Sequence, residues 1–112
     1  MTVYDTAQLV RFDPDRFTTR RVFESPDGLV VWFGFQPGQA LREHQTSSRA
    51  WIQVLKGKVA VEVDQDRVTL EAGQNVVLAP EVPHSVTALE QSILQVVLFP
   101  HPHRHTLLDV ES

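Results

Sequence analysis

The sequence predicts an antiparallel all-β domain, either a sandwich or a barrel, from three observations. Short segments rich in valine, threonine and aromatic residues recur along the chain, a composition that suits strands. Turn signals made of glycine, proline and aspartate separate these segments about every eight to twelve residues. No long amphipathic helix lies between them, which argues against a sheet built from βαβ units.

The expected strands follow one another from residue 17 onward. Segments 17–24 and 29–35 flank the tetrad Ser-Pro-Asp-Gly at 25–28, whose proline and glycine suit a tight turn. Over 58–64, valines alternate with polar or small residues, as in a strand with one dry face. Segment 6–12 alone has some helical character. The remaining strands are expected over 51–55, 67–70, 76–78, 84–89 and 92–99.

The length and net charge of the chain limit the number of domains and the kinds of partner. The chain has 112 residues, of which 42% are apolar, so we expect one domain over 1–112. Its core is expected over about 17–99, with 1–16 and 100–112 peripheral. Ten Lys and Arg against fourteen Asp and Glu give a net charge of −4, which argues against nucleic acid as a partner.

The lack of cysteine and the short apolar runs exclude cysteine-based sites and membrane-spanning helices. The chain has no cysteine, so disulfides, thiolate nucleophiles and Cys-ligated metals are excluded. The longest apolar run, 28–35, is far shorter than the roughly twenty residues of a membrane-spanning helix. The N-terminal residues lack the basic-then-apolar pattern of a secretory signal. We therefore expect a cytoplasmic protein with no membrane partner.

Two stretches carry a more specific signal. The first has PGQALREH at 37–44 and VLKGK at 54–58; the second has LEAG at 70–73 and PEVPH at 80–84. Together they resemble the two sequence motifs of the cupin superfamily, in which Gly precedes His-x-His, Glu and Gly, and a second Gly precedes a Pro-rich turn and a third His. The resemblance implies a double-stranded β-helix, a jelly-roll-like antiparallel barrel whose site lies inside.

The match to the metal-binding positions of the cupin motifs is incomplete. His44 and His84 occupy the first and the last histidine positions. Thr46 stands at the second histidine position and Ala50 at the glutamate position, while Glu81 stands where glycine is usual. Ala50 has no donor atom, and the neutral hydroxyl of Thr46 is a poor ligand for a transition metal. Two of the four usual metal ligands are therefore absent.

The resemblance leads us to expect His44 and His84 to meet in the barrel, with two interpretations open. They could hold one divalent transition metal ion, such as Zn, Ni, Fe, Mn or Cu. A third donor would then be needed. Gln53 is one candidate, because it lies an even number of residues from Val59 and would face the same side of a strand. Glu43, if the strand slips by one residue, and water are the others. A bulge at Gly57 would invalidate this count from Val59 to Gln53. Alternatively, both rings bond to the backbone or to an organic ligand.

The residues expected to line this pocket are Thr46, Ala50, Trp51 and Gln53.

The tail holds a second candidate metal site. His101, His103 and His105 occupy alternate positions and would share one side of an extended segment. Pro100 and Pro102 lack amide protons, so the segment is an edge or a solvated, polyproline-like tail.

These expectations favour a small cupin-type protein that binds a small molecule in its barrel without turning it over. The alternatives are a metal-dependent enzyme of the oxygenase or isomerase type that uses His44 and His84, and a metal-free enzyme in which one of these histidines moves a proton. Fold alone does not choose among them. The resemblance also implies a homodimer, which would cover exposed sheet edges.

Overall fold

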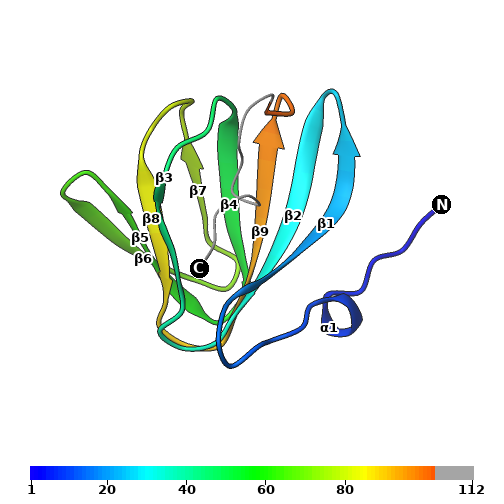
Figure 1. The fold of residues 1–112 in the computed structure, drawn as a ribbon, viewed down its shortest axis with the longest axis horizontal. Coiled ribbons are helices and arrows are strands. Elements are labelled where there is room, and N and C mark those ends of the chain that lie inside the picture. The colour runs from blue at the N-terminus through cyan, green and yellow to red at the C-terminus, as the bar shows by residue number, and fades with distance from the viewer. Residues whose placement is uncertain (103–112) are drawn as a thin grey trace.

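The computed structural model describes residues 1–102 and contains two antiparallel sheets facing each other (Figure 1). The five-stranded sheet has the order β1-β2-β9-β4-β7, and the four-stranded sheet has the order β3-β8-β5-β6. This confirms the predicted antiparallel all-β fold. The elements are α1 (Thr6–Leu9), β1 (Thr18–Ser25), β2 (Gly28–Phe35), β3 (Ala40–His44), β4 (Arg49–Lys56), β5 (Lys58–Val63), β6 (Asp66–Glu71), β7 (Asn75–Leu78), β8 (His84–Ala88) and β9 (Ser92–Phe99).

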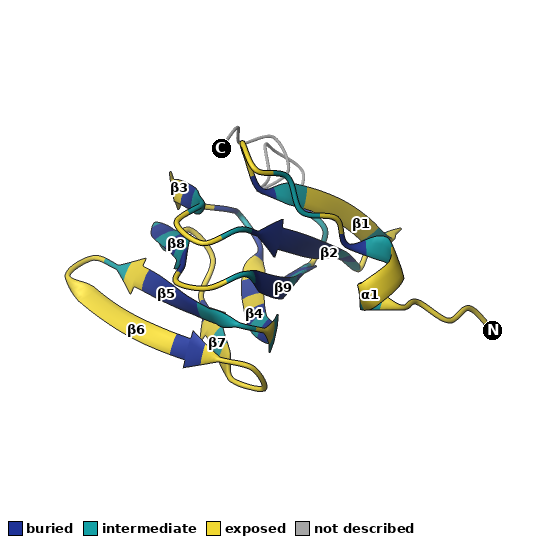
Figure 2. Ribbon diagram, turned by 90° about the horizontal axis from the view of Figure 1, so that it is seen from below, coloured by how far each residue is buried: buried dark blue, intermediate teal, exposed yellow. Residues whose placement is uncertain are grey.

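The core lies between the inner faces of the two sheets. Figure 2 shows that β2 and β9, in the middle of the five-stranded sheet, are mostly buried, whereas the edge strands β1 and β6 are mostly exposed. The rings of Phe33 and Phe35 stack at 5.9 Å, and Phe17 contacts both. Each fully buried aromatic or aliphatic side chain stabilises the fold by roughly 1.5–3 kcal/mol.

The N-terminal segment packs against the outer face of the five-stranded sheet. Val10 is buried with Trp32 and Ile93, and the ring of Tyr4 meets the indole of Trp32 edge-on at 6.4 Å. The helical character expected over 6–12 is limited to α1, which Asp5 caps by accepting a hydrogen bond from the Ala7 amide. The described part of the chain contains no helix long and apolar enough to cross a membrane.

The structure adds one strand that alternation did not indicate. β3 pairs with β8, and its register shifts between Leu41 and His44. Arg42 and Glu43 are both exposed, so this stretch lacks the period of two on which the strand expectations relied. A β-bulge explains the irregular pattern, because it places two residues of one strand opposite one residue of its partner.

Gly38, Gly57 and Gly73 adopt positive φ, and the first two differ in their surroundings. Gly57, between β4 and β5, has φ +86°, and a Cβ there would collide with the Gln91 carbonyl and the Ser92 hydroxyl. Gly38 has φ +85°, but a Cβ there would meet nothing within 4 Å. A side chain at either position is strained, and at Gly57 it also clashes with Gln91 and Ser92.

We predict that Gly57→Ala lowers the free energy of unfolding by about 3 kcal/mol or more, whereas Gly38→Ala lowers it by only about 1 kcal/mol. Urea unfolding of both variants measures the difference. Equal losses in the two variants would mean that the contacts around Gly57 are not tight.

Candidate functional site

His44 and His84, which are far apart in the sequence, face each other in the four-stranded sheet. His44 ends β3, His84 begins β8, and the two are direct partners in the register of these strands. Their ring centroids lie 4.3 Å apart, with the planes inclined at 61°. The structure thus brings together the two histidines that the sequence singled out.

The bulge in β3 is what directs His44 inward. In a regular strand, His44 would face opposite to Leu41, because the two are three residues apart. On β8, however, the partners Val86 and His84 are only two residues apart and therefore share a face. The extra residue in β3 returns His44 to the side of Leu41, which is the buried side of the sheet.

Hydrogen bonds to the backbone fix the orientation of both rings. Nδ1 of His44 lies 2.7 Å from the carbonyl oxygen of Arg42, and Nδ1 of His84 lies 2.9 Å from that of Val82. A carbonyl only accepts, so each Nδ1 carries the proton and donates it. Each Nε2 then keeps its lone pair. Both Nε2 atoms are buried without a hydrogen-bond partner, a costly arrangement for the protein alone.

Burial keeps both imidazoles neutral. Desolvation lowers the pKa of His44 to about 4, although its hydrogen bond to Arg42 opposes this effect and the neighbouring His84 adds to it. The pKa of His84 is also lowered, again mainly by burial. At neutral pH the site therefore presents two electron-pair donors side by side, the form in which histidine accepts a hydrogen bond or ligates a metal.

The two substituted motif positions are buried but supply no strong donor. The Thr46 carbonyl accepts a 2.8 Å hydrogen bond from the Glu81 amide, which ties the loops of the two motifs together. The Thr46 hydroxyl accepts one from the Ser48 amide at 3.3 Å. Ala50 lies in the core. Within residues 1–102, no group of three or more His, Asp or Glu side chains could hold a metal.

Trp51 and Gln53 do not line the barrel, which corrects the expectation for these two residues. On β4, Ile52 and Val54 point into the core, so Trp51 and Gln53 point outward. The Gln53 amide oxygen accepts a hydrogen bond from Gln95 on the outer face.

Gln53 was predicted to face the same side as Val59 because an even number of residues separates them. This prediction failed because two irregularities lie between these residues. The register of β4 shifts between Val54 and Lys56, and Gly57 has positive φ. The alternation of Ile52 and Val54 within β4 itself would have given the right face. Glu43 is exposed, and the bulge leaves it outside while His44 faces inward.

Of the three tail histidines, only His101 is described. Its Nε2 lies 2.5 Å from Oε2 of Glu24, and its Nδ1 lies 2.8 Å from the carbonyl oxygen of Pro102. The contact with His101, followed by that with Arg21, lowers the pKa of Glu24. His103 and His105 lie outside the described residues, so the secondary metal site stays a hypothesis.

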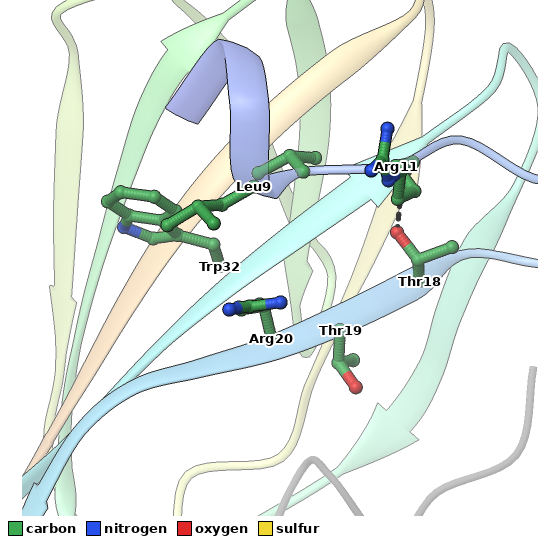
Figure 3. A pocket seen from close by; sticks show the side chains of 7 residues that line it. Leu9, Arg11, Thr18, Thr19, Arg20 and Trp32 are labelled. Carbon is green, nitrogen blue, oxygen red and sulfur yellow. Dashed lines mark hydrogen bonds between the residues drawn. The ribbon is translucent and has the colours of Figure 1, made fainter. Parts of the chain in front are cut away.

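Two recesses lie outside the barrel, beside the N-terminal segment. One of about 220 Å³ lies between this segment and β1 and β2, with Trp32 in its wall (Figure 3). There the Thr18 hydroxyl donates to the Arg11 carbonyl. The other, of about 410 Å³, is lined by Thr6, Ala7, Val10, Phe12, Leu55, Lys56 and Ile93. Neither contains His44 or His84.

Comparisons with known proteins agree with the fold. The family described as "Cupin domain" matches residues 31–100. No curated protein matches the chain significantly.

Solved structures are similar over most of the chain. An RmlC-like cupin from Desulfovibrio desulfuricans is 29% identical, with a TM-score of 0.83 over 90% of this chain and 98% of that one. The TT1209 protein of Thermus thermophilus is 28% identical, with a TM-score of 0.82 over 91% of this chain and 100% of that one. KdgF from a Halomonas species is 25% identical, with a TM-score of 0.71 over 77% of this chain and 82% of that one.

We predict that the metal-free protein loses stability as the pH falls from 7 to 5. Because the folded-state pKa of His44 is about 4, below its ordinary value of 6.5, the unfolded chain binds its proton more readily between these values. The free energy of unfolding should fall by about 1–2 kcal/mol, a figure reduced for partial solvent screening. Urea unfolding in the presence of a chelator measures this loss.

A His44→Gln, His84→Gln double variant is the control for this pH dependence. Its free energy of unfolding should change less than that of the wild type between pH 7 and 5. An equal change in both proteins would show that other groups cause the dependence.

Proposed function

The chain belongs to the cupin domain family, with a double-stranded β-helix fold, and we propose that it binds one small organic molecule inside the barrel, against the Nε2 atoms of His44 and His84. The observation that carries this proposal is the pair of buried Nε2 atoms that have no hydrogen-bond partner. Such atoms are stabilised when a ligand donates to them.

The surroundings of the histidine pair support one chemical class of ligand. Each Nε2 accepts a hydrogen bond, so the ligand carries hydroxyl or N–H groups on one side. Leu41 and Val86 are partners in the same two strands and are buried beside the histidines. The rest of the ligand therefore meets an apolar wall, which suits a compact molecule with one polar and one apolar side.

Binding without turnover agrees with the charges at the site. Among the described residues, the buried polar side chains are Thr46, Ser48, His84 and Ser92, and none of them is a carboxylate. Efficient proton transfer at neutral pH needs a group whose pKa lies near the working pH. The pKa of about 4 for His44 makes it a weak base, which disfavours the metal-free enzyme.

A second candidate is a divalent metal ion held by His44 and His84, as in a metal-dependent enzyme of the oxygenase or isomerase type. The supporting observation is that each Nδ1 donates to a backbone carbonyl, the arrangement that orients metal-binding histidines. The two rings fit such an ion, and water or ligand atoms would complete its coordination. A bound ion would polarise an oxygen atom of the ligand.

We predict that ligand binding depends on both imidazoles. Metal-free protein is screened by thermal shift against a panel of diols, hydroxy acids, phenols and amides, and hits are measured by calorimetry. His44→Phe and His84→Phe keep a ring but remove the acceptor, so each should weaken binding at least about tenfold. His101→Phe is the matched control and should leave binding unchanged. Hits that bind both variants as well as the wild type would refute the barrel site.

Zinc titration of the metal-free protein separates the two candidates. If one Zn²⁺ binds per chain, is lost in His44→Phe and His84→Phe, and persists in a chain truncated after Phe99, the metal candidate replaces the first proposal. If truncation alone abolishes zinc binding, the tail is responsible and the barrel holds no metal.

A further inference from the structure

The smaller recess beside the N-terminal segment, of about 220 Å³, combines an apolar wall with positive charge (Figure 3). Leu9, Val10 and Trp32 form its apolar part, and Arg11 and Arg20 form its charged part. Among the described residues, none that lines it is acidic, although the chain has fourteen Asp and Glu against ten Lys and Arg. The local charge is therefore opposite in sign to the net charge of the chain. We call this site the arginine recess.

The two arginines of the recess have no partner inside the protein. Within residues 1–102, neither the guanidinium group of Arg11 nor that of Arg20 makes an ion pair or a hydrogen bond. In contrast, Arg21, the next residue on β1, pairs with Glu24 at 2.8 Å. Water satisfies an exposed guanidinium group, but one without an internal partner keeps all five of its N–H donors for a ligand.

The threonines beside the arginines do not supply further donors. The Thr18 hydroxyl already donates its proton to the Arg11 carbonyl. Figure 3 shows that Thr19 points to the other side of β1, as alternation along a strand requires. The side-chain donors available to a ligand are therefore the guanidinium groups. That of Arg20 is placed on the strand position directly opposite Trp32 in the pairing of β1 with β2.

The apolar wall of the recess is ordered before any ligand arrives. Val10 is 8% exposed and Trp32 is 6% exposed, and both pack in one cluster with Ile93. The indole N–H of Trp32 donates to the side chain of Gln95 at 2.9 Å. A wall whose large side chains are already fixed loses little conformational entropy when a ligand binds to it.

Gly34 allows the N-terminal segment to lie close enough to the sheet to form this recess. A Cβ at Gly34 would collide with the Arg11 carbonyl, the Thr18 hydroxyl and the Val10 side chain. The missing side chain therefore seats residues 10 and 11 directly on β2. Two walls of the recess, the segment and the sheet, are held at a fixed separation as a result.

We propose that the arginine recess binds a small carboxylate with an apolar body, such as an aromatic acid. The carboxylate accepts two parallel hydrogen bonds from the Arg20 guanidinium group, and Arg11 adds a second positive charge. The apolar body lies against Leu9, Val10 and Trp32. A volume of about 220 Å³ equals that of roughly seven water molecules, which suits a ligand of about ten non-hydrogen atoms.

The arginine recess and the barrel select ligands of opposite polarity. In the barrel, the Nε2 atoms of His44 and His84 have no partner and accept hydrogen bonds, so the ligand there carries donors. A guanidinium group only donates, so the ligand of the recess carries acceptors, and its negative charge strengthens the bonds. The two proposals are therefore independent, and each can fail without the other.

Benzoate tests the site in the full chain, with the two tryptophans as reporters. In nitrogen-15 NMR at neutral pH, the indole and backbone signals of Trp32 should shift as benzoate is added, whereas the indole signal of Trp51, on β4, should not. We expect a dissociation constant of about 1 mM, as for a ligand of roughly nine atoms on an open site. Benzyl alcohol lacks the charge and acetate lacks the ring, so each should bind at least about tenfold more weakly.

Two variants that each remove one positive charge locate the binding site. Arg20→Gln should weaken benzoate binding roughly fivefold or more, a loss limited by the exposure of the site to water. Lys56→Gln is the matched control, because Lys56 lines the other recess beside the same segment, and it should leave binding unchanged. Circular dichroism checks that both variants are folded.

Four results would overturn the proposal. They are a Trp32 signal that does not move at 20-fold the expected dissociation constant, equal binding of benzyl alcohol and benzoate, unchanged affinity in folded Arg20→Gln, and a loss of affinity in Lys56→Gln that matches the loss in Arg20→Gln. The last result would mean that benzoate responds only to the net charge of the chain.

Discussion

The candidate site depends on the cross-strand pairing of two histidines. In each ring, one nitrogen is hydrogen-bonded to the backbone and the other has no partner. Each Nδ1 of His44 and His84 donates to a carbonyl two residues earlier in the chain, and each Nε2 is buried without a partner. The backbone therefore selects the tautomer, and burial keeps the rings neutral. A protein that leaves two buried acceptors unpaired bears a cost in stability, and a ligand that donates to them would remove it.

The geometry of this pair arises from an irregularity in the strand that carries it. Without the bulge after Leu41, His44 would face away from the core. Glu81, in the neighbouring loop, has φ +66°, a strained conformation for a residue with a side chain. Its amide nevertheless bonds to Thr46 and joins the two motif loops. The barrel end with the histidines thus combines a strand bulge with a residue of positive φ.

Much of the fold was predictable from the sequence, because alternation and turn residues are local signals. The cupin motifs also placed His44 and His84 together, a contact that local patterns cannot supply. The facing of Gln53 was predicted wrongly, because the count of positions from Val59 crossed a bulge and a turn. Neighbours across the five-stranded sheet could not be predicted, because only the registers between strands place such residues side by side.

The two faces of the five-stranded sheet have separate roles. The inner face closes the barrel, whereas the outer face packs against the N-terminal segment. Substitutions on the outer face can therefore leave the barrel untouched, because side chains on opposite faces of a sheet do not meet.

Nitrogen-15 NMR of the imidazole rings in metal-free protein at neutral pH shows most directly which ring nitrogen carries the proton. For both His44 and His84, we predict a protonated Nδ1 and an unprotonated Nε2, with magnetisation transfer between the two rings across the strand pair. Rings that carry the proton on Nε2, that are doubly protonated, or that show no contact with each other would contradict it.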